Sequence, residues 1–270
     1  MFTVLGASGF IGSNLVRRLE AESIPCRSPS RDENVMGKPL GHVVYCVGLT
    51  ADFRERPFDT VRAHVAHLLD ILERAEFDSF LYLSTTRVYA GSDSSGEDST
   101  IQVNPTKAND LYNISKIMGE SLSLGSRRPN VRVARLSNVY GRDFTSPNFL
   151  ASVIREAVEN NRVVLRTSLR SEKDYVSVDD VTRLLPRIAL SGRHQIYNIA
   201  SGVNTSNAEL MEVIKRAVGC PVEVAGDAQT VRFPRISIER IREEFDFSPS
   251  LVLDSLAELV NDYQQQAIGK

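Results

Sequence analysis

The sequence of 270 residues contains no tryptophan and only three cysteines, Cys26, Cys46 and Cys220. An odd number of cysteines without C-x-x-C spacing argues against a disulfide framework and against a zinc site, so we expect a reducing, cytoplasmic setting and no metal. An excess of charge is also missing, because 32 Lys and Arg face 34 Asp and Glu and give a formal net charge of -2. This balance implies no overall attraction to nucleic acid or to an anionic membrane.

Long hydrophobic runs are absent as well. No uninterrupted apolar stretch approaches the ~18 residues of a membrane-spanning helix, and an apolar strand pattern that starts at residue 2 leaves no room for a secretion signal. A chain of this length can bury a substantial core as one large α/β domain or as a domain with a smaller lobe. We therefore expect a soluble, unexported protein.

Three glycines at three-residue spacing follow the first apolar run. The letters are FTVL at residues 2–5 and GASGFIG at residues 6–12, and an amphipathic pattern follows. A strand, a turn and a helix in this order are the context that a dinucleotide-binding turn requires. Gly6 allows the tight turn, Gly9 lets the backbone approach a pyrophosphate, and Gly12 lets the helix and strand pack closely. The alternative is a strand-to-helix turn without a ligand.

Strand patterns alternate with helical patterns along the first half of the chain. We expect strands over 43–47, 80–83 and 131–136, with a helix over 61–75 between the first two. This alternation predicts an α/β fold, a Rossmann-type doubly wound parallel sheet with helices on both faces. The polar segment 91–100 follows a strand end, where such sheets bind ligands, and is expected to be an exposed loop.

Beyond residue 143 the alternation loosens, which indicates a second, smaller C-terminal α/β lobe. Its expected elements are helices over 148–160 and 207–218 and short strands over 162–166 and 195–200. The predicted division is a dinucleotide-binding domain over 1–143, rejoined by 175–192, and a substrate lobe over 144–174 and 193–270.

A tyrosine and a lysine four residues apart carry the predicted chemistry. Tyr112 and Lys116 lie on one face of the expected helix, one turn apart. A free tyrosine, with a pKa of ~10, is a poor base near neutral pH, and a nearby positive charge lowers that pKa. Tyr112 is then able to exchange a proton with a substrate hydroxyl or ketone, while Thr85, at the end of a strand, holds the reacting oxygen.

These motifs resemble the extended short-chain dehydrogenase/reductase family, in particular its NAD(P)-dependent nucleotide-sugar epimerases, dehydratases and 4-ketoreductases. The resemblance covers nearly the whole chain and rests on five segments in order: GASGFIG at 6–12, LSTTRVY at 83–89, YNISK at 112–116, RLSNVYG at 135–141 and DYVSVDD at 174–180. It implies that Tyr112 is the acid/base, that Thr85 is the catalytic hydroxyl, and that Lys116 lowers the tyrosine pKa and binds the nicotinamide ribose.

The resemblance also implies the residues that bind the ligands. For the cofactor these are Gly6, Ser8, Gly9, Phe10, Ile11, Gly12, Ser28, Arg31, Cys46, Val47, Gly48, Tyr112 and Lys116. For the nucleotide-sugar substrate they are Thr85, Thr86, Asn138, Asn148 and Arg232, of which Asn148 and Arg232 are expected at the diphosphate. The family further implies a homodimer that pairs the helix bearing Tyr112.

The chain departs from the family at the two residues after Thr85. Members that eliminate water across C5 and C6 of the sugar usually carry an Asp-Glu pair there, whereas this chain has Thr86 and Arg87. An arginine cannot lose its proton near neutral pH, so the sequence disfavours a 4,6-dehydratase and leaves epimerase and ketoreductase open.

A second departure concerns the choice between NAD and NADP. An NAD site expects an acidic residue near the end of the second strand, where this chain offers Arg27, Ser28 and Arg31. These residues favour NADP, although a strand one turn longer would bring Asp32 into the position typical of NAD enzymes. About ten residues separate Arg31 from Gly41, so the sheet is expected to be trimmed here.

His64 stands where the family commonly carries an asparagine, and His67 lies one turn along the same expected helix. No acidic residue completes an H-E-x-x-H set, so we expect polar residues on a helix surface or near the cofactor rather than metal ligands. The leading functional hypothesis is a nucleotide-sugar epimerase or reductase. The alternative is a non-catalytic NAD(P)-binding sensor or interaction protein of the same fold.

Overall fold

The main sheet of the protein consists of six parallel strands. In the computed structural model, which describes residues 1–50 and 52–268, their order is β2-β1-β3-β4-β5-β9. The strands are β1 (Phe2–Leu5), β2 (Cys26–Arg27), β3 (His42–Tyr45), β4 (Ser79–Thr85), β5 (Val131–Leu136) and β9 (Ile196–Ile199). The strand order reverses between β1 and β3, the position at which such sheets bind ligands beyond their carboxyl ends. The predicted doubly wound α/β fold is confirmed.

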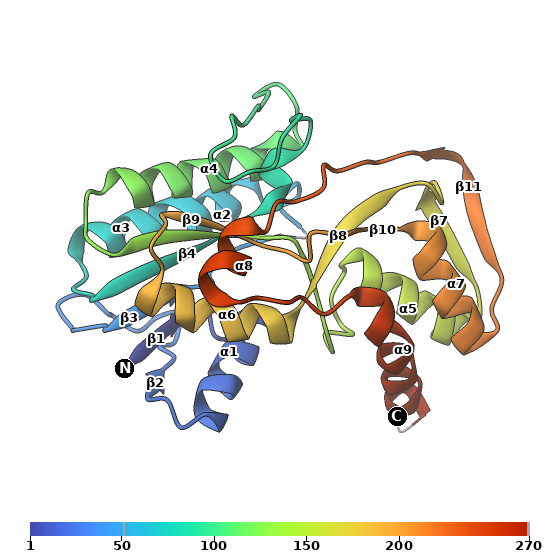
Figure 1. The fold of residues 1–270 in the computed structure, drawn as a ribbon, viewed down its shortest axis with the longest axis horizontal. Coiled ribbons are helices and arrows are strands. Elements are labelled where there is room, and N and C mark those ends of the chain that lie inside the picture. Colours follow the sequence, from blue (N-terminus) through green and yellow to red (C-terminus); the bar gives the residue numbers. More distant parts are fainter. Residues whose placement is uncertain (51, 269–270) are drawn as a thin grey trace.

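Helices cover both faces of this sheet (Figure 1). One face carries α1 (Phe10–Ala21) and α6 (Val178–Ser191). The other carries α2 (Pro57–Val61), the π-helical turn η1 (Arg62–Ala66), α3 (His67–Arg74) and α4 (Asp110–Gly125). Successive strand residues enter opposite cores, as Leu81 and Tyr82 of β4 do, because side chains alternate between the faces of a strand.

A second lobe lies beyond the carboxyl end of the sheet, at the right in Figure 1. It contains the sheet β10-β8-β6, the parallel pair β7 and β11, and three helices around one apolar core. The elements are β6 (Asn138–Tyr140), α5 (Phe149–Asn160), β7 (Val163–Thr167), β8 (Glu172–Ser177), β10 (Asn204–Ser206), α7 (Asn207–Val218), β11 (Val222–Gln229) and α9 (Val252–Ile268). The helices expected over 148–160 and 207–218 are present with nearly these bounds.

One strand expected in the second lobe belongs to the main sheet. β9 pairs in parallel with β5, and α8 (Glu239–Phe245) packs against β9. Phe245 and Tyr197 share the core that lies under α6. Their placement in the substrate lobe is therefore corrected, because the local pattern identified a strand but could not show its distant partner. The remainder of the predicted domain division stays a prediction.

The polar segment 91–100 is held more tightly than an exposed loop. Ser95 and Glu97 are only 6% and 5% exposed. The Ser95 hydroxyl donates a hydrogen bond to the Arg235 carbonyl at 2.5 Å. The backbone amide of Asn198 donates one to the Glu97 carboxylate at 3.1 Å. The expectation is thus wrong for these two residues, whose polar groups find buried partners on β9 and the segment before α8.

The connection from β2 to β3 is short, as expected. Between Ser28 and Gly41 the chain forms turns and one bridge, at Pro39, in place of a helix and strand. Among the residues that the structure describes, no helix is long and apolar enough to cross a membrane.

Candidate active site

The glycine turn joins β1 to α1 at the carboxyl edge of the sheet. Gly6 has a φ of +85°, and a Cβ there would lie 2.8 Å from the Cys46 carbonyl carbon. A Cβ at Gly12 would lie 2.4 Å from the Gly6 oxygen, so both glycines are required by close backbone packing. A Cβ at Gly9 would meet the same oxygen at 3.4 Å, an ordinary contact. Packing within the chain therefore explains Gly6 and Gly12, while Gly9 leaves a bare backbone at the start of α1.

This helix start suits a phosphate group. The first turn of α1 carries no acidic side chain, and its unpaired amides point away from the helix. Ser8 is exposed beside the turn, and Phe10 and Ile11 begin the helix, with Ile11 packed against the core. The residues present thus fit the pyrophosphate of a dinucleotide.

The end of β3 lies next to this turn. Cys46 and Val47 follow the strand directly, and a Cβ at Gly48 would lie 3.2 Å from His64 Nε2 and 3.4 Å from Lys116 Nζ. The predicted lining residues 46–48 are therefore brought together with Lys116.

The end of β2 carries an unpaired cation. The strand stops at Arg27, so Asp32 lies in a later turn and not in the position typical of NAD enzymes. Arg27 Nε and Nη2 are buried without a hydrogen-bond partner within residues 1–50 and 52–268. Ser28 follows directly, whereas Arg31 lies near His67, whose pKa is lowered by burial and by the Arg31 charge, against Asp70. Buried guanidinium nitrogens without a hydrogen-bond acceptor are unfavourable, so this position suits a bound anion.

Tyr112 and Lys116 lie on the buried face of α4, each 5% exposed. Burial raises the pKa of Tyr112 to about 12, while the Arg87 charge and a hydrogen bond from the Thr85 side chain act in the opposite direction. Lys116 donates a hydrogen bond from Nζ to the Leu83 carbonyl at 2.9 Å. Burial lowers the pKa of Lys116 to about 8, against the charges of Glu120 and Cys46. Thr85 thus lies close enough to the phenol to affect its pKa.

Arg87, rather than Lys116, is the cation that lowers the pKa of the phenol here. Its guanidinium carbon lies 5.5 Å from the Tyr112 ring centroid. The i,i+4 spacing placed Tyr112 and Lys116 on one helix face but could not show where the ammonium group points. Sequence reasoning had treated Arg87 only as a replacement for an acidic residue.

His64 is fully buried in η1, so a position on the helix surface is excluded. The Leu49 amide donates to its Nε2 at 3.2 Å, and its Nδ1 lies 2.8 Å from Ser115 Oγ. Because Ser115 donates its own proton to the Tyr112 carbonyl, His64 Nδ1 is the donor in that pair. Burial and the Lys116 charge lower the pKa of His64 to about 2, so the ring is neutral. No group of metal-ligating side chains occurs in the described part of the chain.

The residues predicted at the substrate are divided between the end of β4 and the second lobe. Asn138 donates to the Asp174 carbonyl at 2.8 Å, Asn148 precedes the first residue of α5, and Arg232 is exposed beside Glu172. Thr86 is buried directly after Thr85. The structure does not join these side chains by direct contacts.

Lys173 is a further candidate that the sequence did not reveal. It extends from β8 to a point 5.1 Å above the Phe149 ring, at the start of α5. Burial, and to a smaller extent the Arg87 charge, lower the pKa of Lys173. Lys173 therefore lies in the second lobe, near enough to Arg87 for the two positive charges to interact. A single lysine without a motif gives no signal in the sequence.

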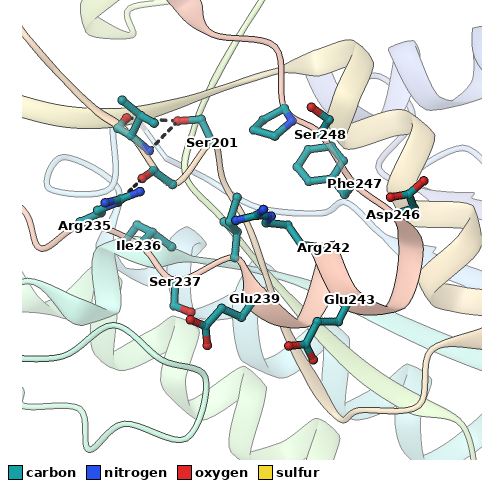
Figure 2. A pocket seen from close by; sticks show the side chains of 14 residues that line it. Ser201, Arg235, Ile236, Ser237, Glu239, Arg242, Glu243, Asp246, Phe247 and Ser248 are labelled. Carbon is teal, nitrogen blue, oxygen red and sulfur yellow. Dashed lines mark hydrogen bonds between the residues drawn. The ribbon is translucent and has the colours of Figure 1, made fainter.

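A cavity of about 1040 Å³ lies elsewhere, between α8 and the turn after β9 (Figure 2). Arg235, which lines it, donates to the Gly202 carbonyl at 2.5 Å. Arg242 and Glu239 also line it, whereas Tyr112, Thr85 and the glycine turn do not. The candidate active site is therefore identified by its side chains and not by the volume of a cavity.

Comparison with known proteins gives relatives of similar sequence. One is a dTDP-glucose 4,6-dehydratase of Streptomyces griseus, 32% identical over 73% of this chain, which spans 62% of that relative. Another is a dTDP-4-dehydro-6-deoxy-D-allose reductase of Streptomyces bikiniensis, 23% identical over 94% of this chain and 93% of its own.

Solved structures share the fold over nearly the whole chain. RMD from Pseudomonas aeruginosa complexed with NADPH has a TM-score of 0.82 at 22% identity, covering 98% of this chain and all of the other. MoeE5 in complex with UDP-glucose and NAD has the same TM-score at 19% identity, covering 98% and 99%. A model of the NAD dependent epimerase/dehydratase family matches residues 2–200, from β1 through β9. The chain belongs to the NAD dependent epimerase/dehydratase family.

Proposed function

We propose that the protein is an NAD(P)-dependent epimerase or ketoreductase of nucleotide-linked sugars, with Tyr112 as its acid/base. The observation that carries the proposal is the position of the Tyr112 phenol beside the Thr85 hydroxyl, at the same sheet edge as the glycine turn. A nicotinamide bound at that edge supplies or accepts the hydride at the sugar carbon.

The chain's own residues move the proton. When a sugar hydroxyl is oxidised, the Tyr112 phenolate takes the hydroxyl proton, and when a ketone is reduced, the phenol returns it. Thr85 holds the reacting oxygen by a hydrogen bond. Arg87 favours the phenolate, because a positive charge stabilises the ionised form of a tyrosine. We assign Lys116 to the nicotinamide ribose, since its ammonium group lies at the end of β3 beside Gly48.

We favour NADP as the cofactor. Arg27 supports this choice, because its buried, unpartnered nitrogens lie at the end of β2, where an NADP enzyme binds the 2'-phosphate. Solved relatives are described with either NADPH or NAD, so the family alone leaves the choice open. The remaining cofactor residues are those predicted around the glycine turn and at residues 46–48.

The second lobe is proposed to bind the diphosphate. Lys173 and Arg232 supply positive charge, and Asn148 lies at the open N-terminus of α5. Amides at a helix start and fixed cations both favour a phosphate group. Asn138 is assigned to the sugar nucleotide.

We infer an epimerase or reductase in preference to a 4,6-dehydratase. Elimination of water needs side chains that give and take protons, and Thr86 and Arg87 are poor candidates. A 4,6-dehydratase at 32% identity is among the relatives, so activity on dTDP-glucose is the direct check of this choice. A non-catalytic sensor is the second candidate, favoured only by the buried, protonated state of the Tyr112 phenol.

A homodimer is also proposed. Phe58 is 77% exposed on α2, and Leu69 on α3 and Met118 on α4 are about half exposed. These apolar side chains lie on the helices over one sheet face, and association of two copies would remove them from water. We place the protein in the cytoplasm, in agreement with its three free cysteines.

The test combines cofactor identification with substrate screening. The dinucleotide that copurifies is identified by mass spectrometry, and thermal unfolding is then followed with nucleotide sugars in the presence of NAD or NADP. A ligand of the folded state raises the melting temperature by mass action. A rise with one nucleotide sugar, followed by cofactor-dependent conversion of that sugar, is expected. Cofactor binding without a response to any nucleotide sugar would favour the sensor.

A further inference from the structure

Arg87 is fixed beside the phenol by the first turn after β4. The Arg87 amide donates to Thr85 Oγ1 at 3.1 Å, which begins the short helix η2 (Thr86–Tyr89). The guanidinium carbon then lies 5.3 Å from the Phe53 ring centroid and 5.5 Å from that of Tyr112. Two aromatic rings and a backbone hydrogen bond therefore hold this cation at the reacting end of the site.

The guanidinium has no anionic partner. Within residues 1–50 and 52–268, no carboxylate forms an ion pair with it, and burial lowers its pKa. Asp110 is the acid that acts on it, but the Asp110 carboxylate accepts a hydrogen bond from the Asn104 amide at 2.9 Å. Arg54 adds a second positive charge nearby, 4.7 Å from the Phe53 ring. A partly desolvated, permanently charged group without a carboxylate partner in the protein gains from a ligand that supplies acceptors.

The position of Arg87 limits what that ligand can be. The sugar carbon that reacts at Tyr112 is flanked by two ring carbons, whose substituents lie only a few bonds from the reacting oxygen. Because Arg87 lies beside the Tyr112 ring, we expect it to face one of these substituents. The diphosphate belongs to the other end of the sugar, where Lys173 lies at the start of α5. A planar guanidinium with paired donors matches a carboxylate group in two parallel hydrogen bonds.

We propose that Arg87 binds a carboxylate on the sugar, so that the substrate is a nucleotide-linked sugar acid and not a neutral sugar. This inference rests on the proposed function and names the substrate class for the same site. The carboxylate is recognised and not transformed, so the proton and hydride steps at the neighbouring carbon are unchanged.

The test compares matched ligand pairs. Dissociation constants are measured by calorimetry for UDP-glucuronate and UDP-glucose, and for GDP-mannuronate and GDP-mannose. The protein is loaded with NADP+ and carries Tyr112→Phe to prevent turnover. For the pair with the correct nucleotide, the acid should bind at least about tenfold more tightly, as a charge-assisted hydrogen-bonded pair permits. Adding Arg87→Met should reduce this ratio to about twofold or less.

Two further variants separate sugar recognition from general loss of charge. Lys173→Met should weaken the acid and the neutral sugar by similar factors, because the proposed diphosphate contact is common to both. Arg87→Lys should give an intermediate ratio, since lysine keeps the charge but loses the paired donors. Retained NADP+ binding shows that each variant is folded.

The outcomes distinguish the two proposals. Equal binding of acid and neutral sugar, with a ratio that Arg87→Met does not change, overturns the role of Arg87 and leaves the proposed function intact. If none of the four nucleotide sugars binds to cofactor-loaded protein, this inference fails. The proposed function fails as well only when dTDP-glucose and the other nucleotide sugars of the thermal-unfolding screen also give no response.

Discussion

The Tyr112 ring meets the His64 imidazole edge-on, with ring centroids 5.5 Å apart. His64 in turn accepts a hydrogen bond from the Leu49 amide and donates one to Ser115. One neutral ring thus connects the segment after β3 with the helix that carries the proposed base. A residue expected on a helix surface or near the cofactor is thus buried, and it supports both segments.

Replacement of His64 should destabilise the fold. His64→Ala removes both hydrogen bonds and leaves a cavity, so we expect a loss of about 2–4 kcal/mol in the free energy of unfolding, measured with urea. His67→Ala is the matched control, because His67 is exposed on the next turn, and its cost should stay below about 1 kcal/mol. Equal losses in the two variants would contradict the supporting role.

The same residue predicts how stability depends on pH. The folded-state pKa of His64 is about 2, below the ordinary value of 6.5, so the unfolded state binds the extra proton as the pH falls below about 6.5. Its contribution is complete at neutral pH and is lost progressively toward the folded pKa. Between pH 7 and pH 5 the loss should be about 2 kcal/mol. The pH dependence of urea unfolding should therefore be flatter in His64→Asn, and an unchanged slope would refute the neutral, buried assignment.

Tyr112→Phe should abolish turnover while leaving the fold and cofactor binding nearly intact. The hydroxyl group is the only part removed, and loss of a general acid/base lowers the rate at least about 100-fold. Tyr263→Phe is the control, because Tyr263 lies on α9 and its hydroxyl contacts Glu159, away from the glycine turn. Unchanged activity in Tyr112→Phe would exclude it as the acid/base.

Two glycine substitutions should separate an effect on stability from an effect on dinucleotide binding. Gly12→Ala places a methyl group 2.4 Å from a backbone oxygen, so it should destabilise the protein by about 1–3 kcal/mol or more. Gly9→Ala meets no such clash and should cost less than about 1 kcal/mol, yet it should weaken dinucleotide binding about tenfold. Urea unfolding and calorimetric titration with NADPH measure the two effects. A folded Gly9→Ala variant with unchanged affinity would show that the backbone there does not approach the pyrophosphate.

Arg27→Gln should discriminate between the two cofactors. If Arg27 pairs with the 2'-phosphate, the variant binds NADPH about 10- to 100-fold more weakly, while its affinity for NADH changes little. Arg17→Gln removes an exposed arginine of α1 that contacts Asn14, and should leave both affinities unchanged. A parallel loss for NADPH and NADH would instead indicate a structural role for Arg27.

The sequence was informative wherever the relevant pattern was local. The glycine turn, the helix face shared by Tyr112 and Lys116, and the helices starting near Asn148 and at Asn207 follow from spacing and composition. Each of these features is decided by residues within a few turns of one another.

Features that depend on distant partners were missed. β9 was recognised as a strand but not as a neighbour of β5, and Ser95 and Glu97 were read as exposed because their partners lie more than 100 residues away. Arg87 was noted as a residue type, but its position over the Tyr112 ring depends on a rotamer and a turn that the letters do not show.

The attachment of segment 91–100 also determines when the active site can form. This segment leads toward α4, and Ser95 is held by the carbonyl of Arg235, 140 residues later in the chain. A nascent chain that has reached β9 contains every proposed catalytic residue but lacks the segment that secures this loop and the helix that covers β9. Because the chain is synthesised from its N-terminus, the contacts that hold segment 91–100 can form only near the end of translation, and until then β9 lacks the cover of α8.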